Sequence, residues 1–293
     1  IIPNSMSAKQ QLAAYLELTK PRITVLVLAT ASLGFVAADY GVTSWSLFFY
    51  TILGTSCAAG GAAALNHFLE RNIDRQMKRT RDRPIPAGLI KPASALSFGV
   101  CLVLVGVFLL LFKTNLLTAF LALLSTFLYV VIYTPMKRLT WLNTSLGAIP
   151  GALPPVGGWT AATGELGAGA WVLFLILFAW QHPHFYAIAW IFRDDYKSAG
   201  FKMLPVLDVD GHRTCRQVVG FCLLLIAVSV LPAAIGNMGP VYLWGVLLLG
   251  CGMLAAGLAL ARSRSEEAAR RLLRASVIYL PLLLLLTITD LSL

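Results

Sequence analysis

The most polar segment of the sequence, residues 66–83, carries three oxygen-bearing side chains at a constant spacing. Asn66, Glu70 and Asp74 recur every four residues, so on a helix they form one stripe of roughly 12 Å. Carboxylate and amide oxygens suit Mg²⁺, whose shell is completed by phosphate and water. The spacing therefore predicts a magnesium site at a helix end. The plainer alternative is a basic membrane anchor with internal Glu–Arg pairs.

Basic and phenolic side chains that could bind phosphate oxygens accompany this stripe and recur later in the chain. Guanidinium groups match the geometry of phosphate, and an ammonium group neutralises it as a point charge. Segment 133–138 ends an apolar stretch, so its cations should lie level with those of 66–83, although they could simply end a helix. We predict that Lys137 assists the reaction and that diphosphate is bound by Arg71, Arg75, Arg83, Tyr133, Arg138, Arg193 and Asp194.

A second acidic site is predicted near residue 195. Asp194 and Asp195 are adjacent and follow Arg193, a combination that could bind both metal and phosphate; a charge pair at a helix end is the alternative. We place Asp195 among the catalytic residues, together with Lys137 and the 66–74 stripe. The predicted metal ligands are Asn66, Glu70, Asp74, Asp194 and Asp195.

Two histidines lie among apolar residues of a predicted membrane span, and a third lies beside the acidic stripe. His182 and His184 fall within an apolar stretch, where ionisable side chains are costly and often functional. Hydrogen bonds to neighbouring helices are the alternative explanation for both. His67 directly follows the first residue of the acidic stripe.

The elements that must position these residues are membrane helices. The chain is 58% hydrophobic and only 12% charged, which excludes an ordinary soluble enzyme. Apolar runs without alternation exclude a membrane barrel. We expect an all-α, polytopic membrane protein with one domain over 1–293, of which 1–12 form a flexible cytoplasmic N-terminus. The nine predicted spans are 22–38, 46–69, 95–112, 115–133, 142–158, 168–192, 217–236, 241–261 and 272–290.

The positive charges fix the expected orientation. With nine spans, every basic loop falls on one side, and only Lys113 lies on the other. Basic loops face the cytoplasm, so the N-terminus should be cytoplasmic. The net charge of +10 is then explained by the membrane surface and implies no nucleic acid. Two acidic sites with nearby cations on one face, above apolar helices, predict an enzyme that uses a polyprenyl diphosphate.

Several motifs resemble those of the UbiA superfamily of intramembrane prenyltransferases. The 66–74 stripe followed by Arg83-Pro-Ile-Pro resembles the first motif, and segment 133–138 resembles the second. Segments 17–22, 150–159, 180–185 and 193–205 resemble the branch of the superfamily that farnesylates heme. The resemblance covers roughly residues 13–290.

This resemblance implies nine helices around a central cavity, with farnesyl diphosphate and heme b as substrates and Mg²⁺ as cofactor. Farnesyl transfer to a heme vinyl group, with addition of water, would give heme O for heme-copper oxidases. The setting would be the bacterial cytoplasmic membrane, and a downstream heme A synthase or the oxidase assembly machinery would be a partner.

Two departures from the superfamily pattern bear on the acceptor. Glu70 stands where many relatives have Asp, which keeps the carboxylate. His184 stands where quinone-directed relatives often have Asp, and an imidazole suits heme iron. We expect His184, with His182 and His67 as further candidates, to bind heme. The alternatives are a superfamily enzyme that acts on a quinone precursor or chlorophyllide, and a transporter with broken helices.

Overall fold

A computed structural model describes residues 7–38, 42 and 44–291, and the regular elements in these residues are all helical. The long helices are α2 (Pro21–Ala38), α3 (Trp45–Asp74), α4 (Pro92–Lys113), α5 (Leu116–Phe127), α7 (Asn143–Thr163), α8 (Ala168–Ile191), α11 (His212–Ala234), α12 (Pro240–Ser263) and α13 (Glu266–Leu291). The short elements are α1 (Ala8–Leu18), the π-helical turn η1 (Leu128–Tyr133), α6 (Thr134–Met136), α9 (Arg193–Ser198) and α10 (Leu204–Leu207).

Eight segments of the described chain are long and apolar enough to cross a membrane, with α5, η1 and α6 forming one of them. The prediction of nine spans is confirmed for these eight. The ninth, predicted at 142–158, is helix α7, which is not among them because Gly, Pro and Thr replace many of its apolar residues. Helix α7 packs against α2, α5 and α8, so it contacts mostly protein and needs less apolar surface.

Two neighbouring helices donate hydrogen bonds to carbonyls of α7, and one of these carbonyls has lost its helical donor to a proline. Pro154 has no N–H to donate to the carbonyl of Pro150. Ser125 Oγ of α5 donates to that carbonyl instead, at 2.9 Å. Gln181 Nε2 of α8 donates to the carbonyl of Ala148 at 3.1 Å. These bonds let a proline-rich helix cross the protein interior as one continuous element.

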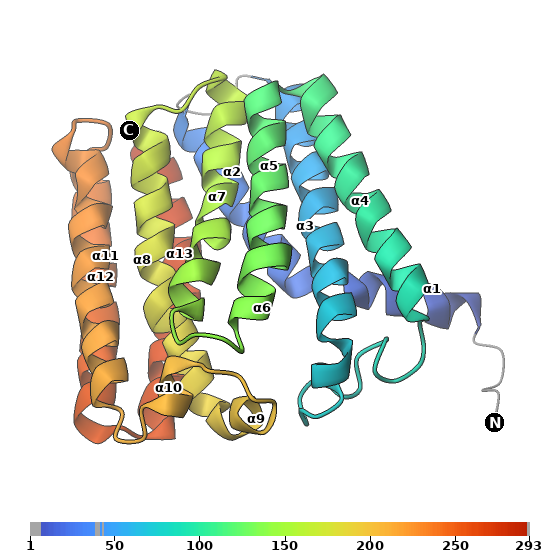
Figure 1. The fold of residues 1–293 in the computed structure, drawn as a ribbon. Helices are drawn as coiled ribbons and strands as arrows, with labels where there is room; N and C mark the ends of the chain where they lie inside the picture. Colours follow the sequence, from blue (N-terminus) through green and yellow to red (C-terminus); the bar gives the residue numbers. More distant parts are fainter. Residues whose placement is uncertain (1–6, 39–41, 43, 292–293) are drawn as a thin grey trace.

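Consecutive long helices alternate in direction, so their connections lie at two opposite faces of the bundle (Figure 1). The lower face in Figure 1 carries the connection from α3 to α4, helix α6, and helices α9 and α10. This face therefore contains the predicted basic loops. At the N-terminal end, residues 8–12 belong to α1, which Ser7 and Gln10 cap reciprocally, whereas residues 1–6 lie outside the described residues.

Two glycines bring α2 and α7 into close contact. A Cβ atom on Gly34 would collide with the backbone carbonyl of Pro155, and one on Gly158 would collide with the carbonyl of Ala31. Only glycine allows the two backbones to approach this closely. The pair of helices forms one wall of the central cavity.

The π-helical turn η1 directs two aromatic side chains into the cavity. Pro135 cannot donate a backbone hydrogen bond, and Thr134 Oγ1 donates to the Tyr129 carbonyl at 2.9 Å. The rings of Tyr129 and Tyr133 lie 5.7 Å apart, and both line the cavity. Such turns occur frequently at functional sites.

Candidate active site

A cavity of about 450 Å³ lies inside the helix bundle. Side chains from α2, α3, α5, α7 and α8 make up most of its wall, and they are mainly apolar. Its charged lining residues come from the ends of helices and from the loops that meet at one face of the bundle: Lys20, Glu70, Asp74, Arg79, Arg83 and Lys137. The cavity thus has one charged end and an apolar body.

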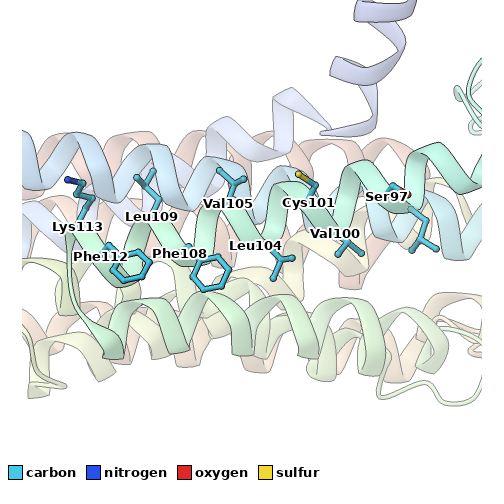
Figure 2. A pocket seen from close by; sticks show the side chains of 10 residues that line it. Ser97, Val100, Cys101, Leu104, Val105, Phe108, Leu109, Phe112 and Lys113 are labelled. Atoms are coloured by element: carbon cyan, nitrogen blue, oxygen red, sulfur yellow. The ribbon is translucent and has the colours of Figure 1, made fainter.

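A second hollow lies on the outside of the molecule along α4. Figure 2 shows its lining side chains, among them Leu104, Phe108 and Phe112, in rows on this one helix. Because a single helix supplies all of them and nearly all are apolar, this hollow is part of the surface that faces lipid.

Each acid of the 66–74 stripe that lines the cavity is paired with a cation from another segment. Glu70 Oε1 accepts a hydrogen bond from Lys137 Nζ at 2.8 Å. Both oxygens of Asp74 accept from Arg83 Nη1, at 2.8 and 2.9 Å. Glu70 and Asp74 are only 5% and 2% exposed, so without these cations their charges would be very costly.

Asn66 does not line the cavity but holds residues around it by hydrogen bonds. Its side chain is completely buried and is not part of the cavity wall. Its Oδ1 accepts from Lys20 Nζ at 2.6 Å, and its Nδ2 donates to Thr134 Oγ1 at 3.1 Å. Asn66 therefore connects the start of α2 with the start of α6.

The sequence analysis missed Lys20. Its backbone φ is 49°, in the left-handed region that residues other than glycine seldom adopt. Burial and the Arg83 guanidinium lower the pKa of Lys20 to about 7. The available signal was a lysine directly before Pro21, because a proline in the first turn marks a helix start and so places Lys20 at the N-terminal end of α2. Its left-handed φ gave no signal, since a residue before proline usually adopts extended backbone.

The predicted second acidic site does not join the first. On one continuous helix, Asp195 would lie on the same stripe as His184, eleven residues earlier, but α8 ends at Ile191 and α9 starts at Arg193. Asp194 is exposed, and Asp195 accepts from the backbone N–H of Arg79 at 3.3 Å. Throughout residues 7–38, 42 and 44–291, no three His, Cys, Asp or Glu side chains are grouped closely enough to share a metal ion.

The predicted phosphate-binding residues divide into two groups. Tyr133 and Arg83 line the cavity, as does Lys137. Arg71 is turned away from it, donates to the Phe68 carbonyl at 2.6 Å and lies over the Phe68 ring. The remaining predicted residues are exposed and do not form part of the cavity wall: Arg75, Arg138 and Arg193.

His184 is the histidine that faces the cavity. Its ring stacks on Trp180 with centroids 4.7 Å apart. Its Nδ1 is 2.8 Å from Ser276 Oγ on α13, while Nε2 has no hydrogen-bond partner in the described part of the chain. A fixed imidazole with one free nitrogen is suited to bind a metal centre.

The structure does not bring the other two candidate histidines to the cavity. His182 is fully buried, stacks on Phe221 at 3.6 Å, and uses both ring nitrogens in contacts with Ser145 Oγ and the Phe178 carbonyl. His67 is 2% exposed, and neither of its ring nitrogens has a partner among the residues described. Neither histidine is part of the cavity wall.

Comparisons with known proteins agree with this geometry. Residues 27–280 match the model of the UbiA prenyltransferase family. The chain is 46% identical over 285 residues to a protoheme IX farnesyltransferase of Solibacter usitatus, covering 94% of this chain and 98% of that protein. A protoheme IX farnesyltransferase of Salinibacter ruber is also 46% identical, with the same two coverages.

Solved structures show the same fold. A digeranylgeranylglyceryl phosphate synthase superposes with a TM-score of 0.81 at 18% identity, covering 96% of this chain and 99% of that one. A UbiA homologue from Archaeoglobus fulgidus bound to GPP and Mg²⁺ has a TM-score of 0.69 at 14% identity, covering 96% of this chain and 100% of that one. The chain therefore belongs to the UbiA prenyltransferase family.

Proposed function

We propose that this protein transfers the farnesyl group of farnesyl diphosphate to a vinyl group of heme b. The first farnesyl carbon bonds to one vinyl carbon as its bond to the diphosphate oxygen breaks. Water then adds its hydroxyl to the other vinyl carbon and releases a proton. The product, heme O, would pass to a heme A synthase or to a heme-copper oxidase in assembly. The observation that carries the proposal is the cavity with one charged end and an apolar body, supported by relatives named protoheme IX farnesyltransferase.

The charged end fits a diphosphate bound with a divalent cation. Four cationic side chains line this end, Lys20, Arg79, Arg83 and Lys137, against the two carboxylates of Glu70 and Asp74. The cluster is net positive even when Lys20 is neutral, so it attracts an anion. Two neighbouring carboxylates are the protein ligands that Mg²⁺ typically takes when phosphate supplies the rest. Glu70 and Asp74 would hold Mg²⁺, which neutralises charge on the departing diphosphate.

The side chains at the charged end of the cavity would have different roles once the diphosphate and Mg²⁺ are bound. Arg83 and Lys137, now bound to the two carboxylates, would turn to the phosphate oxygens. The rings of Tyr129 and Tyr133 line the adjoining wall, where their faces can stabilise positive charge on the farnesyl carbon. Asn66 keeps Lys20 and Thr134 in place.

The other substrate would lie deeper along α8. We propose that His184 Nε2 binds the heme iron and that Ser276 fixes the ring through Nδ1. The Trp180 ring, which stacks on His184, also lines the cavity and would add apolar surface beside the porphyrin. The charged end would face the cytoplasm, because it lies at the face with the basic loops, and the membrane would be the bacterial cytoplasmic membrane.

A choice between acceptors tests the proposal. Purified protein in lipid vesicles would receive farnesyl diphosphate, Mg²⁺ and an equimolar mixture of heme b and a hydroxybenzoate ring. Mass spectrometry should detect a farnesyl group and a hydroxyl group added to heme only. A prenylated ring, with heme b unchanged, would favour the quinone-directed alternative. A chain that moved substrate across the vesicle without any prenyl product would be a transporter.

A further inference from the structure

A glutamine of α8 leaves one polar atom unused inside the cavity. Gln181 Nε2 donates to the Ala148 carbonyl of α7 and to the Leu177 carbonyl of its own helix, both at 3.1 Å. Only the nitrogen of an amide can donate, so these two bonds fix which end of the side chain is the oxygen. The side chain lines the cavity and is 5% exposed, and its Oε1 has no hydrogen-bond partner in the described part of the chain.

A glycine of the facing helix provides the space for this oxygen. A Cβ atom on Gly151 of α7 would lie only 2.1 Å from Gln181 Oε1, far inside van der Waals contact. Gly151 itself lines the cavity. The absence of a side chain on α7 therefore lets the amide of α8 lie against the α7 backbone, with its oxygen at the cavity wall.

Hydroxyl groups in the apolar body of the cavity have a different arrangement. Thr30, Ser125 and Thr126 line the same cavity, and each donates to a backbone carbonyl, at 2.8 or 2.9 Å. Such bonds satisfy the hydroxyl donor within the protein. Gln181 instead keeps an acceptor oxygen without a donor, which is costly at a buried site. We therefore expect a bound group to donate to this oxygen.

The chemistry of the amide oxygen limits what this group can be. An acceptor oxygen repels other acceptors, which excludes the diphosphate and the carboxylates of heme. The iron is proposed to bind His184 Nε2. Water remains: it is small and neutral, it carries two donors, and buried water binds polar groups that the protein leaves unsatisfied.

The position of Gln181 on α8 suits a water molecule that takes part in the reaction. His184 follows Gln181 by three residues, so their side chains are neighbours on one face of the helix. Both line the cavity. Water bound to Gln181 Oε1 would lie beside a porphyrin that is bound at His184.

We propose that Gln181 binds and orients the water that adds to the vinyl group, a role that rests on the proposed function for the identity of the acceptor. Once the first farnesyl carbon has bonded to one vinyl carbon, the other vinyl carbon is positively charged. The water donates a hydrogen bond to Oε1, and a lone pair of its oxygen forms the new C–O bond. The proton that the water loses passes to the released diphosphate, because an amide oxygen is too weak a base to keep it.

The same cation has a second outcome when no water is in position. Loss of a proton from the carbon that bears the farnesyl group forms a double bond, and the product is lighter than the hydrated product by one water molecule. The ratio of hydrated to dehydrated product therefore reports where the water lies, whatever the rate of farnesyl transfer. A merely structural role of Gln181 would change stability or rate and leave this ratio unchanged.

Two substitutions on facing helices test the water site. Gln181→Met keeps the length of the side chain and removes the acceptor oxygen. Gly151→Ala keeps the amide but displaces its oxygen, which is the flexible end of a side chain and can move. The matched control is Gly157→Ala, because Gly157 also belongs to α7 and lines the cavity, but its Cβ would meet no atom within 4 Å.

Purified protein in lipid vesicles would receive farnesyl diphosphate, Mg²⁺ and heme b, and mass spectrometry would measure both products. In Gln181→Met and Gly151→Ala, the ratio of hydrated to dehydrated product should fall about tenfold, the effect of one lost hydrogen bond. Gly157→Ala should keep the ratio of the unaltered protein.

An unchanged ratio in both test variants would overturn the proposal. Loss of both products from folded test variants would also overturn it, since the amide would then serve farnesyl transfer itself. Failure of the proposed function is distinguishable, because the unaltered protein would then leave heme b without any farnesyl group.

Discussion

Replacement of Lys137 by alanine tests whether its ion pair with Glu70 is the resting state of a diphosphate site. Lys137 Nζ lies 2.8 Å from Glu70 Oε1, and the two side chains are 15% and 6% exposed. Removal of one partner from so buried a pair should cost about 3 kcal/mol of folding stability, because the other charge stays buried without compensation. Loss of the cation from the reacting end should slow farnesyl transfer by about 10²- to 10³-fold.

A second substitution separates stability from chemistry. Glu70→Gln removes the charge that Lys137→Ala leaves unpaired, so the double variant Glu70→Gln/Lys137→Ala should regain much of the lost stability. It should not regain activity, since both the cation and a proposed metal ligand are missing. Lys197→Ala, an exposed lysine of α9, is the matched control and should behave like the unaltered protein.

The assay combines thermal unfolding in detergent with farnesyl transfer and heme binding. Burial alone would lower the pKa of Lys137, but the Glu70 carboxylate and the nearby tyrosines raise it above its ordinary value. Lys137 is therefore charged throughout the usual assay range, and its effect should not vary with pH. Heme binding should be nearly unchanged. Undiminished turnover in Lys137→Ala, or recovery of activity in the double variant, would refute the reasoning.

Three further predictions concern the metal, the missed lysine and the heme end. Asp74→Asn should lower turnover at least about 10²-fold and raise the Mg²⁺ concentration for half-maximal rate; near-normal turnover at limiting Mg²⁺ would contradict this. Because the pKa of Lys20 is lowered to about 7, Lys20 loses its charge as pH rises through 7, and the affinity for farnesyl diphosphate should fall over that range. Lys20→Arg keeps its charge and should flatten this pH profile. An equal slope in both proteins would show that Lys20 does not bind the diphosphate. His184→Ala should weaken heme binding and shift the heme absorption spectrum while diphosphate binding is retained; an unchanged spectrum would make His184 a packing residue.

Regular periodicity made much of the site predictable. Asn66, Glu70 and Asp74 lie on one helix, so their spacing alone places them on one stripe of α3. Lys137 and Arg83 could be expected beside them because charge distribution assigns both loops to the same face. These inferences need only local helix geometry and the asymmetry of basic loops.

Features that depend on breaks in the helices were not predictable. The stripe from His184 to Asp195 fails because α8 ends at Ile191 and a separate helix starts at Arg193. The apolar pattern predicts the end of the span at 192, but it does not show that the polar residues after it start a new helix. Lys20 reaches the cavity through an uncommon backbone conformation. His182 and His184 lie two residues apart in the sequence. Tertiary packing alone decides that His182 uses both ring nitrogens, one of them on Ser145, whereas His184 faces the cavity with Nε2 free.

Mass spectrometry of heme from membranes tests the central claim most directly. The chain would be produced in bacteria that lack their own heme O-forming enzyme, beside the Asp74→Asn variant as a control for folded but inactive protein. We predict that the unaltered chain converts heme b to a species heavier by one farnesyl and one hydroxyl group and that the variant does not. Heme b alone in both membranes, with both proteins present at equal levels, would contradict the account.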